Sequence, residues 1–142
     1  MPTQEEFEVA ADYLFTAAAR VEEVATSVQQ FDVAAILRGG VLGRQVPARL
    51  ASSANLARVS AARMEATAAT CLERAAIIAD YLVRLAAYDI ALGKYEQASF
   101  QYYTSLAHWE ASDGRSSHPG GTPPVAPTPP DHPPAWADVR RV

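Results

Sequence analysis

The sequence has little of several residue types, and each scarcity narrows the range of possible functions. Among 142 residues there is one cysteine, Cys71, which excludes an internal disulfide framework and a cysteine-rich metal site. The three histidines include no i, i+4 pair, so no histidine metal site and no cofactor are expected. The chain also lacks a basic excess. Its formal net charge of −4 argues against general affinity for nucleic acid.

Long apolar runs are absent as well. No run approaches the roughly 18 residues of a membrane-spanning helix, so membrane insertion is not expected. The first eight residues, MPTQEEFE, are acidic and lack the apolar core of an ordinary signal peptide. We therefore expect a cytoplasmic protein that, if it is exported, leaves the cell by a leaderless route.

No arrangement of residues indicates catalysis. Neighbouring carboxylates such as Glu5 and Glu6 point in different directions on a helix, so a solvated face explains them better than acid–base chemistry. Cys71 lies at a predicted buried position with no visible base. The stretch GGVLG at residues 39–43 lacks the Lys-Ser/Thr ending of a phosphate-binding loop. The protein is therefore expected not to be an enzyme.

Alanine dominates what is present, with 29 copies, and it favours helices over strands. The first helix is predicted to run from Thr3 to Phe31. Thr3 followed by Glu6 matches a capping box. Apolar residues then recur at alternating steps of four and three, the heptad pattern of a coiled coil. This first seam consists of Phe7, Ala11, Leu14, Ala18, Val21, Ala25 and Val28.

A second helix is predicted to begin at Pro47, a residue suited to the first helical position. Residues 32–47 contain glycines and are expected to connect the two helices. Residues 1–32 carry a net charge of −6 and residues 38–74 a net charge of +4, which favours pairing as an antiparallel helical hairpin. The second seam consists of Leu50, Ala54, Ala57, Ala61, Met64, Ala68, Cys71, Ala75, Ile78, Leu82 and Leu85.

Gly93 leaves two architectures open within this all-α fold. A turn at Gly93 would fold a third helix, from Lys94 to Ala111, back over the apolar end of the second. This turn is the preferred prediction. Alternatively, the second helix continues through Gly93, because a glycine inside a helix costs only about 1 kcal/mol. Asp89 lies on the extrapolated seam and marks either a rotation of the buried face or a partner contact.

Aromatic residues recur every seven positions across Gly93, and we predict that they form an interface. Aromatic side chains favour interfaces because they bury much area at small entropic cost. The same rings could instead fill the core between a second and a third helix, and the sequence does not decide between these roles. The predicted interface residues are Tyr81, Tyr88, Tyr95, Tyr102 and Trp109.

The composition changes near Asp113, which separates a helical domain (residues 1–112) from a tail (residues 113–142). Eight of the sixteen residues from Pro119 to Pro134 are proline. Such a segment cannot build a core, so a disordered, polyproline II-like tail is predicted. It serves as a solubilising linker or, through Pro-x-x-Pro spacings, as a ligand for an aromatic groove.

Residues around Gly93 resemble one tetratricopeptide unit, in which a glycine closes the first helix and a tyrosine opens the second. The resemblance covers about 30 residues, and a single copy is below the three that stacked repeats need. It implies a local helix–turn–helix. The matching residues are Leu82, Leu85, Ala86, Gly93, Tyr95, Ala98, Tyr102 and Leu106.

The alanine-rich helices and the Pro-rich tail together resemble the type VII (ESX) secretion substrates of actinobacteria, the Trp-x-Gly superfamily and its secretion-associated relatives. The most similar part is QQFDVAAILRGGVLGRQVPARLASSANLARVSAARM, residues 29–64. The Trp-x-Gly turn is replaced by RGG. The family's Tyr-x-x-x-Asp/Glu export signal has its nearest counterpart in WEASD, with Trp109 and Asp113 at the two key positions.

This second resemblance implies a non-enzymatic partner or substrate protein of type VII secretion. Members of the group pair as helical hairpins, so the expected partner is another hairpin in a homodimer or heterodimer. Two other functions remain open: a cytosolic tetratricopeptide-like adaptor or chaperone, and an antitoxin or immunity protein.

Overall fold

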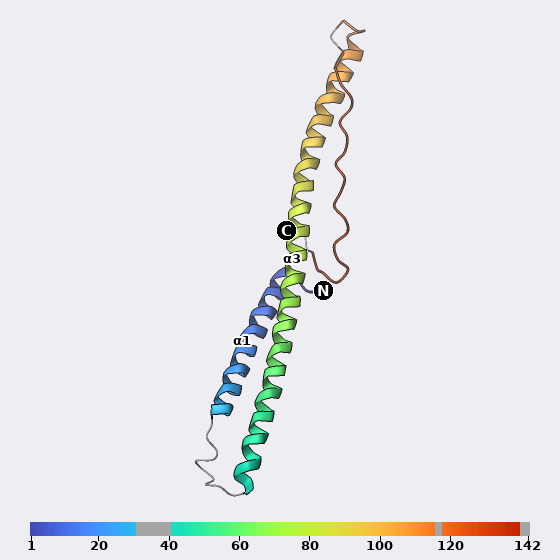
Figure 1. Cartoon of the computed structure of the whole chain (residues 1–142). Coiled ribbons are helices and arrows are strands. Elements are labelled where there is room, and N and C mark those ends of the chain that lie inside the picture. The colour runs from blue at the N-terminus through green and yellow to red at the C-terminus, as the bar shows by residue number, and fades with distance from the viewer. Residues whose placement is uncertain (31–40, 116–117, 140–142) are drawn as a thin grey trace. The chain divides into compact units, whose positions relative to one another are not determined.

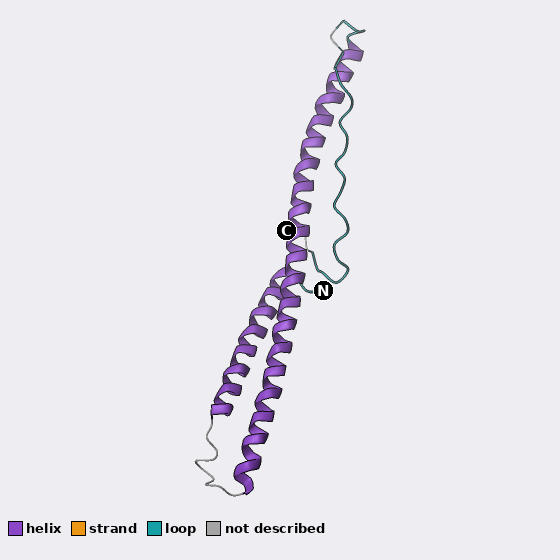
Figure 2. Cartoon of the chain, viewed as in Figure 1, coloured by secondary structure: helices purple, strands orange, loops and turns teal. Residues whose placement is uncertain are grey.

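The computed structural model describes residues 1–30, 41–115 and 118–139, with side chains of the second helix described from residue 45 onward. It contains two helices, α1 (Gln4–Gln30) and α3 (Val41–Ala111) (Figures 1 and 2). No strand occurs among these residues, so the prediction of an all-α fold is confirmed over the described part of the chain.

The start of α1 is fixed by the capping box that the sequence predicts. The Glu6 amide donates to Thr3 Oγ1 at 3.3 Å, and the Thr3 amide donates to Glu6 Oε2 at 2.8 Å. These reciprocal bonds satisfy two donors that have no partner inside the helix. The acidic side chains of the first turn also lie at the positive end of the helix dipole.

Alanine methyl groups form the buried seam between α1 and the first half of α3. Burial is nearly complete at every one of these positions, as at Ala68, which is 0% exposed. Met64 and Cys71, two larger residues of the second seam in this part of α3, are only half-buried. Small side chains let two helix backbones approach closely, which is how two helices make a core without large residues. The buried seam alanines are Ala11, Ala18 and Ala25 of α1 and Ala54, Ala61, Ala68 and Ala75 of α3.

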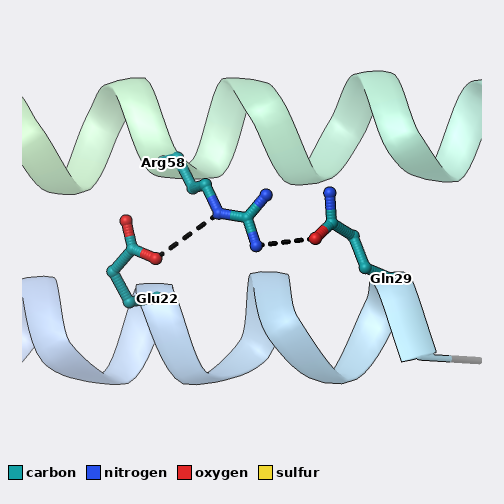
Figure 3. Close-up of polar contacts among 3 residues, drawn as sticks. All are labelled: Glu22, Gln29 and Arg58. Carbon is teal, nitrogen blue, oxygen red and sulfur yellow. Dashed lines mark hydrogen bonds and ion pairs between the residues drawn. The ribbon is translucent and has the colours of Figure 1, made fainter.

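The contacts between α1 and α3 show that the two helices pack antiparallel: later residues of α1 contact earlier residues of α3. Phe7, near the start of α1, lies 5.8 Å from the Arg74 guanidinium. Further along α1, Glu22 pairs with Arg58, which comes earlier in α3 (Figure 3). The Arg58 Nε–Glu22 Oε2 distance is 3.6 Å, and Arg58 Nη2 donates to Gln29 Oε1 at 2.7 Å. The acidic first helix therefore does meet a basic side chain of the second.

The turn predicted at Gly93 is wrong, because α3 continues through this residue to Ala111. The alternative of a very long second helix is the one observed. Gly93 does not have the positive φ of a helix-ending glycine, and a Cβ built on it would meet nothing within 4 Å. The 71-residue helix has a hydrogen-bonded backbone on both sides of one glycine, so a local cost of about 1 kcal/mol does not interrupt it.

The predicted start of the second helix is also wrong. α3 begins at Val41, so Pro47 lies inside the helix and residues 41–47 do not belong to the connection. Proline has no amide hydrogen for the fourth preceding carbonyl, and this normally disfavours a position beyond the first turn. The rest of the predicted connection, residues 32–40, and Phe31 lie outside the described residues.

The chain divides into two units, and the division falls within α3 after Ile77. One unit, which we call the N-terminal unit, comprises Met1–Ile77 together with Trp136 and the described residues after it. The other, the C-terminal unit, comprises Ile78–Ala135. The described tail residues 118–139 contain neither helix nor strand, consistent with the extended form predicted from their prolines.

Candidate interaction surface

The five aromatic residues predicted as an interface lie on one face of α3, in the C-terminal unit. We call them the aromatic stripe. Their seven-residue spacing corresponds to two helical turns, so their side chains leave the helix in nearly the same direction. All five are half-buried in the isolated chain. The aromatic stripe consists of Tyr81, Tyr88, Tyr95, Tyr102 and Trp109.

Burial along α3 changes position near the middle of the helix. The seam position held by alanine up to Ala75 is taken by Leu82 and then by Asp89, which is exposed. The buried positions beyond it are the aromatic stripe and the adjoining row that begins with Ile78 and Leu85. Asp89 therefore lies where the covered face of α3 shifts around the helix toward the tyrosines, which is the first of the two explanations given for it above.

The opposite face of the same helical segment is open. Val83, Ile90 and Phe100 are each more than three-fifths exposed, whereas Leu85 on the covered face is only 8% exposed. In the C-terminal unit, α3 is thus covered on one face only. Ser99 lies on the covered side, between Tyr95 and Tyr102 in sequence, and its hydroxyl oxygen is buried without a hydrogen-bond partner.

The residues resembling an export signal lie where α3 ends. Ser112 Oγ donates to the Trp109 carbonyl at 2.8 Å, and α3 stops at Ala111. Asp113 has a left-handed φ of 48°, so it does not continue the helical face that carries Trp109. The Trp109 ring packs edge-on against His118, with 4.5 Å between ring centroids. The structure therefore does not place Trp109 and Asp113 together on one helix face.

Sequence reasoning missed a contact made by the end of the tail. In the N-terminal unit, Trp136 packs edge-on against Phe7 at 5.7 Å, and the Arg74 guanidinium lies 5.3 Å from the Trp136 ring centroid. The Asp138 amide donates to the Pro2 carbonyl at 3.1 Å, and Ala137 is buried. A tryptophan in a tail otherwise poor in large apolar residues was the available signal.

The titratable side chains of the described residues form no buried cluster. Among them no polar or charged residue is buried, and no three His, Cys, Asp or Glu side chains are placed to share a metal ion. Cys71 is free and half-buried on the seam. No helix within the same ranges is sufficiently long and apolar to cross a membrane.

Comparison with known proteins gives no independent assignment: no family model, curated protein or solved structure is significantly similar to this chain.

Proposed function

We propose that this protein acts without catalysis, as a helical partner or substrate protein of type VII secretion that binds another protein through helix–helix contacts. The observation that carries the proposal is incomplete burial. The two helices bury one narrow alanine seam, and large apolar side chains remain exposed on both helices. Such surfaces are typical of proteins that complete their core by association.

The N-terminal unit illustrates the incomplete burial. Val9 and Tyr13 are 64% and 73% exposed on α1, and they line a shallow groove together with Glu5 and Glu6. On α3, Leu56 is 70% exposed. Two helices form only one layer, and a second pair of helices would cover these side chains as in a four-helix bundle. The proposed partner is therefore another helical hairpin.

The link to type VII secretion rests on the sequence resemblance alone. In this proposal the chain pairs in the cytoplasm and is then exported by the type VII system. The two residues of the WEASD stretch, Trp109 and Asp113, are proposed to serve as its export signal. A secretion receptor would have to recognise them in the helix-ending conformation described above.

Export is tested in an actinobacterial host that carries a type VII system. The tagged protein is expected in the culture filtrate, and it should disappear from the filtrate when the secretion ATPase is deleted. Trp109→Ala with Asp113→Ala should abolish export. Glu110→Ala, an exposed neighbour, should not. Retention of the unmodified protein in cells with an active system would contradict the proposal.

Pairing through the aromatic stripe is tested separately, by measuring the molecular mass of the protein in solution. Tyr88→Ala combined with Tyr95→Ala should reduce a dimer, or a complex with the native partner, to the monomer mass in light scattering. The helix content should stay unchanged in circular dichroism. If the variant instead loses its fold while the unmodified protein is already a monomer, the rings belong to the core and the interface assignment fails.

The structure gives no support to the tetratricopeptide-like adaptor. That reading required a helix–turn–helix at Gly93, and α3 is continuous there. An antitoxin or immunity role is favoured by no observed feature.

A further inference from the structure

The one-sided cover of the aromatic stripe needs a physical cause. The described residues of the C-terminal unit are the second half of α3 and the tail up to Ala135. A straight helix does not bury its own side chains along one face while leaving the opposite face open. Among the described residues of this unit the tail is the only other segment, and it runs along the same stretch of α3 in Figure 1. The tail is therefore the segment that is available to cover the stripe.

In the tail, partly buried residues recur at a regular interval of three. Every third residue is a half-buried proline, whereas the residues between them include Pro123, Val125 and Pro129, which are exposed. Val125 is 89% exposed. A polyproline II helix has three residues per turn, so residues three apart share one face. The covered face of the tail consists of Pro124, Pro127, Pro130 and Pro133.

The repeat of prolines along the tail and the repeat of aromatic residues along α3 have similar lengths. Three residues of polyproline II rise about 9.3 Å, and seven residues of an α-helix rise about 10.5 Å. Successive prolines can therefore meet successive aromatic rings over several repeats. The contact of His118 with Trp109 holds the beginning of the tail at one end of the stripe.

We propose that the aromatic stripe is a polyproline II binding surface and that its resident ligand is the proline face of the chain's own tail. Proline rings on flat aromatic side chains are the usual basis of polyproline recognition, and a preformed polyproline II segment loses little entropy on binding. Attachment to the same chain raises the local tail concentration, so a modest affinity suffices. The proposal goes beyond the secretion function and stands without it.

Occupancy by the tail has a consequence for partners. A helix that uses the aromatic stripe must first displace the tail, as must a proline-rich segment from another protein. The buried Ser99 hydroxyl has no partner while the tail is in place. The tail therefore leaves one hydrogen bond unmade. A competing segment that offers an acceptor to the Ser99 hydroxyl would bind the stripe more tightly by that hydrogen bond.

A spin label on the full-length chain tests the proposal. Val125→Cys in a Cys71→Ala background places one nitroxide on the exposed face of the tail. With a docked tail, the label should broaden backbone amide signals of α3 residues 78–111 in the same molecule. A tail that moves freely, as its composition predicts, would broaden no α3 segment selectively, and this result would overturn the proposal.

A mixed sample identifies the chain that supplies the tail. Spin-labelled protein without ¹⁵N is combined with ¹⁵N-labelled protein without the spin label. Broadening in this mixture would show that a second copy supplies the ligand and would overturn the assignment to the chain's own tail. Its absence, together with broadening in the singly labelled protein, supports the assignment. Neither result depends on secretion, so the two proposals fail separately.

Matched proline substitutions test the covered face. Pro127→Ala with Pro130→Ala removes two rings from it and should lower the docked population roughly tenfold, which corresponds to about 1.4 kcal/mol. Pro123→Ala with Pro129→Ala removes as many prolines from the exposed face and should change the broadening little. Equal effects of both pairs would mean that general stiffness of the tail, and not the proline face, controls docking.

Discussion

At the scale of single residues, the fold depends on side chains that are small. The seven buried seam alanines offer one methyl group each, so the helices are held by close backbone approach more than by large apolar side chains. Surface charge adds little to this. The Arg58–Glu22 pair is partly exposed, at 35% and 43% for the two side chains, and such pairs contribute about 0–1 kcal/mol.

Enlarging one seam alanine should therefore be costly. Ala68→Leu inserts three carbon atoms where the side chain is 0% exposed, and we expect a loss of about 1–3 kcal/mol in the free energy of unfolding. Ala69→Leu, on the exposed face, should change stability by less than about 0.5 kcal/mol. Urea denaturation followed by circular dichroism measures both. Similar values for the two variants would mean that α1 does not lie against Ala68 in solution.

Ser99 allows a second residue-scale prediction. Its hydroxyl oxygen is buried without a partner, and an unsatisfied buried hydroxyl costs about 1–3 kcal/mol. Ser99→Ala should therefore raise the free energy of unfolding, by up to about 1 kcal/mol because the residue is only half-buried. Ser105→Ala, at an exposed position of the same helix, should have little effect. A loss of stability at Ser99 would reveal a hydrogen bond in solution.

At the scale of the helices, the sequence predicted the start of α1 and the end of α3 better than the course of the chain between them. The capping box gave the start of α1, and the composition change gave the end of α3 at Ala111, because both depend on local chemistry. The turn predicted at Gly93 did not occur, and the second helix begins at Val41 instead of the predicted Pro47. A single unfavourable residue has a local cost, whereas continuing a helix depends on the whole segment and its packing.

Gly93 provides a test of helix continuity. A Cβ would enter open space there and the backbone is not left-handed, so Gly93→Ala should stabilise the protein by about 0.5–1 kcal/mol. Gly114→Ala is the opposite control. Gly114 has a φ of +76°, and alanine there should cost about 1 kcal/mol. Thermal unfolding measures both, and destabilisation by Gly93→Ala would point back to a turn.

At the scale of the whole chain, the tail is the part that sequence reasoning described least well. Its extended conformation follows from proline content, but its contacts depend on residues far apart in sequence. Trp136, Phe7 and Arg74 come from three separate segments, and no periodicity links them. The aromatic stripe, in contrast, could be found from its seven-residue spacing within one helix. Whether a partner uses it could not be read from the spacing, because interfaces and cores use the same residue types.

The docking of the tail end should be measurable. Trp136→Ala removes the ring contacts with Phe7 and Arg74 and should cost about 1–2 kcal/mol in stability. It should also make the tail more sensitive to limited proteolysis. Val125→Ala, a change at a tail position that is 89% exposed, should alter neither property. Unchanged proteolysis of the Trp136 variant would mean that this end of the tail is not held in solution.

The alanine seam has a further consequence for alignment. Alanine recurs at every seventh position on both helices, so sliding α1 along α3 by one heptad would present nearly the same methyl surface again. The seam alone cannot distinguish these registers. The unique groups at Phe7, Glu22 and Gln29, which meet Arg74 and Arg58, occur only once along the helices. These weak contacts therefore contribute little stability, but they select one register of α1 along α3 from several that the seam alone makes equivalent.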